Sequence, residues 1–170
     1  ANDLHITFNP GTPIETRALC GLSLQIPTGQ FVTVIGTNGA GKSTFLNAIS
    51  GDLSIDSGSI LIDDLDVTAQ PVWARAKQVA RVFQDPMAGT CEDLTIEENM
   101  SLAEQRGQRR GLSRAVKASQ RAGFREHLAT LGLGLENRLH DRIGLLSGGQ
   151  RQAVSLLMAA LRPSQIMLLD

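Results

Sequence analysis

Three glycines and one lysine lie together in residues 36–44, which read GTNGAGKST, and two hydroxyl residues follow the lysine. An apolar run precedes this segment at residues 31–35, and a stretch that predicts a helix follows it at residues 42–50. Glycine adopts backbone angles that other residues avoid, and it lets amide groups approach a ligand closely. A helix N-terminus adds unpaired N–H groups and the positive end of the helix dipole. The segment therefore predicts a cradle for phosphate, with a plain glycine turn as the structural alternative.

The segment matches the pattern G-x-x-x-x-G-K-[ST], which gives specific roles to the lysine and to the hydroxyl residue. In such a loop the lysine supplies positive charge to the β- and γ-phosphates, and the hydroxyl that follows it binds Mg²⁺. Here these two residues are Lys42 and Ser43. The whole predicted phosphate-binding set is Gly36, Asn38, Gly39, Ala40, Gly41, Lys42, Ser43 and Thr44. This chemistry predicts that the loop binds phosphates together with Mg²⁺, and by itself it does not distinguish kinases, GTPases, motors and transporters.

A second glycine-rich segment, LSGGQ, occupies residues 146–150 and precedes another apolar helical stretch. Ser147 and Gln150 form the S-x-x-Q pattern of a capping box, so a helix start explains part of the segment. A cap does not require the two successive glycines, Gly148 and Gly149. They predict a smooth surface rich in amide groups, which a second phosphate contact could use.

An LSGGQ segment downstream of such a loop resembles the signature motif of ABC-type ATPases, and the resemblance covers nearly the whole chain. Residues 36–44 resemble the Walker A loop of that family, Gln84 resembles the glutamine of its Q-loop, and Asp170 resembles the acidic residue of its Walker B strand. The resemblance implies that catalysis depends on Lys42, Gln84 and Asp170. It implies ATP as the bound nucleotide, with a Mg²⁺ site at Ser43, Gln84 and Asp170. It also implies nucleotide contacts at Ser147, Gly148, Gly149 and Gln150, with Phe8 stacking on the adenine.

The family pattern continues beyond the residues that this sequence contains. A glutamate that polarises the attacking water usually follows the Walker B aspartate, and a switch histidine comes later, whereas this sequence ends at Asp170. Its three histidines, His5, His127 and His140, all precede that position. We therefore expect a chain truncated after the Walker B aspartate. The longer parent would be an ATPase, and the chain alone would bind nucleotide weakly and hydrolyse it at a background rate.

The elements that would position these residues follow from the apolar patterns along the chain. Alternating or short apolar runs predict strands at residues 4–8, 22–26, 31–35, 59–62, 79–83 and 166–169. Helical spacing predicts helices at residues 42–50, 112–131 and 153–161, the last apolar almost all round and therefore buried. We expect an α/β fold of the P-loop NTPase type, with a parallel sheet, an N-terminal antiparallel β-layer and an inserted helical subdomain. Residues 1–85 and 147–170 would form the ATP-binding core, and residues 86–146 the helical subdomain.

Composition sets limits on the partners. The chain has 170 residues, 42% of them hydrophobic, and a formal net charge of −1. This charge gives no general attraction to nucleic acid. The two cysteines have no metal-type spacing, and no apolar run reaches the length of about 18 residues that a membrane span requires. We expect a peripheral protein at the cytoplasmic face of the plasma membrane.

Two classes of function stay open at this point. The first is the ATPase subunit of an ABC membrane transporter, and the second is a soluble ABC ATPase of the DNA-repair or translation type; an exporter subunit is a further variant of the first. The chain is similar to bacterial importer subunits of the tryptophan or tyrosine type, which favours import of a small solute such as an amino acid. The implied partners are a second nucleotide-binding subunit in a head-to-tail dimer, membrane permease subunits that dock near residues 84–99, and indirectly a periplasmic or lipoprotein solute-binding protein.

Overall fold

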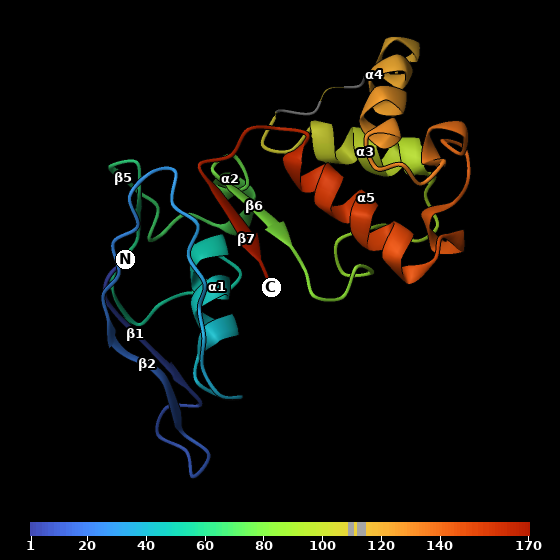
Figure 1. Cartoon of the computed structure of the whole chain (residues 1–170). Coiled ribbons are helices and arrows are strands. Elements are labelled where there is room, and N and C mark those ends of the chain that lie inside the picture. The colour runs from blue at the N-terminus through green and yellow to red at the C-terminus, as the bar shows by residue number, and fades with distance from the viewer. Residues whose placement is uncertain (109–110, 112–114) are drawn as a thin grey trace. The chain divides into compact units, whose positions relative to one another are not determined.

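The computed structural model describes residues 1–108, 111 and 115–170, coloured along the chain in Figure 1. The described residues form two compact units, Ala1–Gln78 and Val79–Asp170. Each unit has its own strands and helices, so each is described by itself. The discontinuous division predicted from the sequence, with residues 86–146 as an inserted subdomain, remains a prediction.

The first unit contains an antiparallel sheet of strands β1 (Asn2–Phe8), β2 (Thr16–Leu22) and β3 (Ser57–Ser59), in the order β2-β1-β3. Leu4 and Ile6 of β1 are buried, as its alternating sequence predicts. A small hairpin, β4 (Leu61–Ile62) and β5 (Leu65–Asp66), follows, and its turn residues have positive φ angles. The antiparallel β-layer expected at the N-terminal side is therefore present.

Helix α1 (Lys42–Ser50) follows the glycine loop and has the bounds that the sequence predicts. Gly51 ends it with a φ of 85°, and the Gly51 N–H donates to the Asn47 carbonyl at 3.1 Å. This is the left-handed cap that glycine accommodates without a steric cost. Phe45, Ala48 and Ile49 make up the buried apolar face. A short helix, α2 (Val72–Arg75), lies near the end of the unit.

The prediction of a strand at residues 31–35 is wrong for this structure. No regular structure is assigned there, and Phe31 and Ile35 are 85% and 90% exposed. A parallel strand inside a sheet needs neighbours along its edges and cover on both faces. In the first unit, which is described throughout, β1, β2 and β3 pair with one another and β4 pairs with β5, so no strand pairs with this run. Likewise β2 ends at Leu22, and the strand predicted at residues 22–26 does not form.

The second unit contains a parallel pair of strands, β6 (Val79–Val82) and β7 (Ile166–Leu169). Val79 pairs with Ile166 and Val82 with Leu169, so the carboxyl ends of both strands meet at one edge. Ala80 and Val82 pack with Ala159 in a small apolar cluster. The two strands expected next to Gln84 and Asp170 are confirmed.

The other part of the second unit is helical, with α3 (Ile96–Glu104), α4 (Ala118–Ala129) and α5 (Gly148–Ala160) side by side (Figure 1). Short 3₁₀ turns occur at Leu135–Asn137 and Ile143–Leu145. These elements share a buried core of Ile96, Met100, Phe124, Leu128, Leu135, Leu139, Ile143, Leu146, Val154 and Met158. No described helix combines the length and the apolar character that crossing a bilayer requires.

Two helix predictions need correction here. The helix predicted at residues 112–131 is present only over the shorter range of α4, because residues 115–117 and 130–131 are not helical and residues 112–114 lie outside the described part of the chain. Helix α5 begins earlier than residue 153, because Ser147 caps it. It is not buried all round, since Leu156 is 46% exposed. An apolar sequence alone does not show which face of a helix is covered.

An ion pair between the buried Glu97 and the partly exposed Arg121 joins α3 to α4. Glu97, in the first turn of α3, accepts hydrogen bonds from Arg121 Nε at 2.7 Å and Nη2 at 3.0 Å. His140 Nδ1 lies 3.3 Å from the same carboxylate. The Arg121 hydrogen bonds outweigh the effect of burial and lower the pKa of Glu97 below its ordinary value. The pair therefore stabilises the helical part while Glu97 is ionised.

The substitution Arg121→Met should reduce stability at neutral pH, because it leaves the buried Glu97 carboxylate without its main partner. A lowered pKa gives stability that is present above the ordinary value of a glutamate and lost as the pH falls through the folded-state value. The difference between variant and wild type should therefore shrink below about pH 4. Urea unfolding at several pH values measures it. Arg138→Met, which breaks the more exposed pair with Asp141, is the matched control and should have little effect. A difference that does not depend on pH would contradict the assignment.

Candidate functional site

The loop before α1 uses glycine for two separate reasons. Gly39 and Gly41 have φ angles of 82° and 86°, in the left-handed region that favours glycine. Gly41 is also sterically required, because an added Cβ would lie 2.7 Å from the Ala18 carbonyl oxygen of β2. Around Gly39 nothing lies within 4 Å of such an atom. The loop is therefore packed against β2 at Gly41 and open at Gly39.

The N-terminus of α1 has no side-chain cap and no acidic residue in its first turn. By contrast, Thr95 and Glu98 cap α3 with a reciprocal pair of hydrogen bonds. The first amide groups of a helix have no partner within the helix. At α1 the amides of Lys42, Ser43 and Thr44 are therefore available to an anion, and the dipole of the helix favours one.

The Lys42 side chain folds back over the loop. Its Nζ donates to the carbonyl oxygens of Gly36 and Thr37, each at 2.8 Å. The ammonium group is thus kept beside the loop that carries the open amides. Ser43, at the same helix start, is exposed. This part of the first unit brings together the amides, the cation and the hydroxyl that the sequence analysis assigned to phosphate and Mg²⁺.

The second glycine-rich segment forms the start of α5. Ser147 Oγ accepts from the Gln150 amide at 3.3 Å, and Gln150 Oε1 accepts from the Ser147 amide at 3.2 Å. The predicted capping box is confirmed. An added Cβ on Gly148 or Gly149 would have nothing within 4 Å in the described residues. Packing within the chain therefore does not require these two glycines, although glycine costs up to about 1 kcal/mol in a helix.

Gln84 and Asp170 lie beyond the carboxyl ends of β6 and β7. The Asp170 amide continues the strand ladder by donating to the Val82 carbonyl at 3.1 Å. Its carboxylate accepts from Arg81 Nη2 at 2.7 Å, and the Arg81 guanidinium stacks 4.6 Å from the centre of the Phe83 ring. Arg81 was not among the residues predicted from the sequence, although alternate residues of a strand share one face. Gln84 is exposed.

The predicted Mg²⁺ ligands fit the chemistry of that ion in part. Mg²⁺ binds through one or two carboxylates, hydroxyls, waters and substrate phosphates rather than through a protein cage. Asp170 supplies a carboxylate in the second unit, and Ser43 supplies a hydroxyl in the first. Among the described residues no group of three or more His, Cys, Asp or Glu could hold a metal ion.

Phe8 is the last residue of β1 and pairs with Thr16 of β2. Its side chain is partly open, with 38% of the residue exposed. Stacking of adenine on Phe8 stays a prediction.

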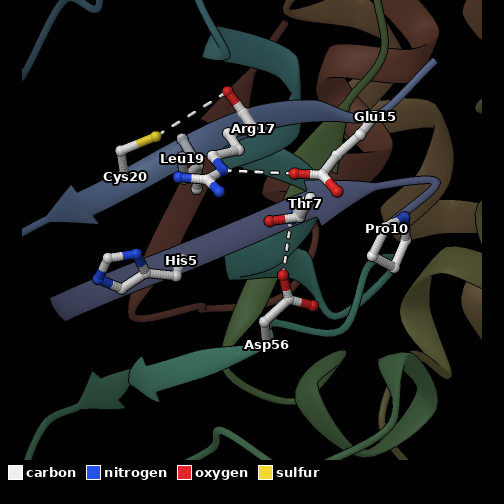
Figure 2. A pocket seen from close by; sticks show the side chains of 8 residues that line it. All are labelled: His5, Thr7, Pro10, Glu15, Arg17, Leu19, Cys20 and Asp56. Carbon is white, nitrogen blue, oxygen red and sulfur yellow. Dashed lines mark hydrogen bonds and ion pairs between the residues drawn. The ribbon is translucent and has the colours of Figure 1, made fainter. Parts of the chain in front are cut away.

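A hollow of about 420 Å³ lies on the outer face of the β1-β2 hairpin (Figure 2). It is lined by His5, Thr7, Pro10, Glu15, Arg17, Leu19, Cys20 and Asp56. Both carboxylates of its lining have partners in the hairpin. Glu15 accepts from Arg17 Nε and from the Gly11 amide, and Asp56, which precedes β3, accepts from the Thr7 amide. None of the predicted site residues lines this hollow.

Comparisons with known proteins identify relatives of this chain. A family model described as ABC transporter matches residues 19–170. A tyrosine transport ATP-binding protein of Clostridioides difficile is 42% identical over 150 residues, which cover 88% of this chain and 59% of that protein. The multidrug resistance protein pgp-1 of Caenorhabditis elegans is 34% identical over 99% of this chain but only 12% of its own length. The chain thus spans less than two thirds of these relatives.

One solved structure has a similar fold. It is a dimeric, post-hydrolysis state of an ATP-binding cassette bound to ADP and Pi. The TM-score is 0.82 at 28% identity, and the match covers 99% of this chain and 72% of the other. The α/β fold class predicted from the sequence is confirmed by this likeness. The tyrosine transport ATP-binding protein among the relatives agrees with the expected resemblance to subunits of the tryptophan or tyrosine type.

The substitution Lys42→Ala should weaken binding of Mg-ATP by roughly tenfold to a hundredfold, the size expected for the loss of charge-assisted hydrogen bonds. The amides of the loop would remain, but its cation would be lost. Calorimetric titration of both proteins with Mg-ATP measures the change. Lys77→Ala removes a lysine of the same unit that has no place in the predicted site, and it should leave affinity unchanged. Equal affinities for Lys42→Ala and wild type would mean that the loop is only a turn.

Proposed function

This chain belongs to the ABC transporter family, and from that premise we propose that it is the nucleotide-binding part of a transporter ATPase subunit. The observation that carries the proposal is the uncapped start of α1, where Lys42 lies beside a glycine loop. A triphosphate supplies the negative charge that this helix start lacks, and it would accept hydrogen bonds from the first-turn amides.

The signature segment supports pairing with a second nucleotide-binding subunit, head to tail. Gly148 and Gly149 present an amide surface with no side chains, and the described part of the chain gives no packing reason for it. A phosphate held by α1 of one subunit could meet this surface on the other. Contact with both subunits exists only in the closed pair, so nucleotide binding would favour closure.

Hydrolysis in the whole protein would depend on positioning and charge. Mg²⁺, when bound, would neutralise charge on the β- and γ-phosphates. Lys42 would hold the γ-phosphate, and Ser43, Gln84 and Asp170 would hold the Mg²⁺. Arg81 holds the Asp170 carboxylate through its hydrogen bond at 2.7 Å, which limits the rotamers of that side chain.

Import of a small solute such as an amino acid is the transport reaction that we favour. The support is the tyrosine transport relative, which is more similar to this chain than the multidrug resistance protein is. The parent would lie at the cytoplasmic face of the plasma membrane. Membrane permease subunits would dock near residues 84–99, and a solute-binding protein would deliver the cargo to them. Export is the alternative direction of transport, and the multidrug resistance relative is its support.

The substitution Gly149→Asp tests the pairing directly. It should leave Mg-ATP affinity within about twofold of wild type, because α1 is untouched, but it should abolish association driven by Mg-ATP, since a carboxylate would face the partner's phosphates. Sedimentation velocity with and without Mg-ATP measures the association. The matched control is Gly123→Asp in α4, another helical glycine around which an added Cβ meets nothing within 4 Å.

Association of the wild type and Gly123→Asp, but not of Gly149→Asp, supports the proposal. If Gly149→Asp associates with Mg-ATP as wild type does, the signature segment has no place at the nucleotide. If wild type binds no Mg-ATP, the assignment of the α1 site fails as well.

A further inference from the structure

Arg75 is the buried cation of the first unit, with only 2% of the residue exposed. Its Nε donates to the Gln70 carbonyl at 3.1 Å, and its Nη2 donates to the Thr68 carbonyl at 2.9 Å. Its Nη1 donates to the carbonyls of Ala48 and Ile49, at 2.5 and 3.0 Å. Burial lowers the pKa of the guanidinium, although an arginine stays charged in proteins. The chain therefore keeps a desolvated cation whose described acceptors are backbone carbonyls.

Two of those carbonyls belong to the last turn of α1. The last four carbonyls of a helix have no partner within it, and a cation there also interacts favourably with the dipole. Gly51 already ends this helix with its own hydrogen bond. Arg75 adds a second contact, because an added Cβ on Gly51 would lie 3.1 Å from both Cδ and Nε of Arg75. The guanidinium thus lies directly against the end of α1.

Helix α1 is consequently fixed at both ends. At its start Gly41 packs on the Ala18 carbonyl, and at its end the Arg75 fork binds Ala48 and Ile49. A helix of this length behaves as a short rigid rod, so a change in the position of its last turn also changes the direction of its first amides. Those amides are the ones that the cradle presents.

We propose that Arg75 is a positioning residue for the phosphate site: by holding the last turn of α1 through two carbonyls, it sets where the first-turn amides of Lys42, Ser43 and Thr44 point. The inference rests on the proposed function in one respect, namely that those amides bind a nucleotide phosphate. A lysine cannot replace this residue, because an ammonium group lacks the planar fork that reaches several acceptors at once.

The test uses Arg75→Lys, which keeps the charge and removes the fork. The backbone amide chemical shifts of Gly41, Lys42 and Ser43 are recorded by NMR without ligand, and the Kd for Mg-ATP is then measured by titration. We expect these distant amide signals to move and the Kd to rise roughly tenfold. Gly51→Ala displaces the fork from the other side and leaves the charge in place, so it should move the same signals.

The control is Ile62→Ala, which removes a buried side chain of β4 in the same unit. It should lower stability, but it should leave the amide signals of the loop and the Kd unchanged. A merely structural Arg75 would make its variants behave like this control, and that result overturns the inference. So does failure of both Arg75→Lys and Gly51→Ala to fold. If the wild type binds no Mg-ATP while Arg75→Lys still moves the amide signals, the proposed function fails. The effect of Arg75 on the position of the first-turn amides is then still supported.

Discussion

The start of α1 carries amide donors that no described side chain caps. Buried or half-buried amides without partners are costly, and helix starts are ordinarily closed by a side chain, as Thr95 and Ser147 close α3 and α5. At α1 the residue in the capping position is Gly41, which has no side chain to offer. The rest of the first unit is arranged so that this open end is held still: β2 packs on the loop, and Arg75 holds the opposite end of the helix.

The glycine-rich helix start of the second unit differs from that of α1, because it has a capping box. Ser147 and Gln150 close the first turn of α5, yet Gly148 and Gly149 leave its surface bare. The backbone before it is also fixed, since Arg151 Nη2 donates to the Gly144 carbonyl at 2.8 Å. This exposed surface has no close packing partner among the described residues. It is suited to contact a ligand that is held by another subunit. The two units therefore support the same mechanism from two different helix starts.

Much of this could be predicted from the sequence, because the signals were local. The bounds of α1, its Gly51 cap and the capping box at Ser147 depend on residues within a few positions of one another. The predictions failed where partners are distant. The run at residues 31–35 has a strand-like composition, but composition does not supply a neighbouring strand. Arg75 and the Arg81–Asp170 pair were missed, because their partners lie 27 and 89 positions away in the sequence.

The central claim is that nucleotide phosphates bind at the open start of α1. Titration of the wild-type chain with Mg-ATP, followed through every backbone amide signal by NMR, tests it most directly. The largest changes should fall on residues 39–44, and the amides of His5, Arg17 and Asp56 around the hollow on the β1-β2 hairpin should change little (Figure 2). Saturable changes centred on that hollow, with residues 39–44 unaffected, would contradict the account.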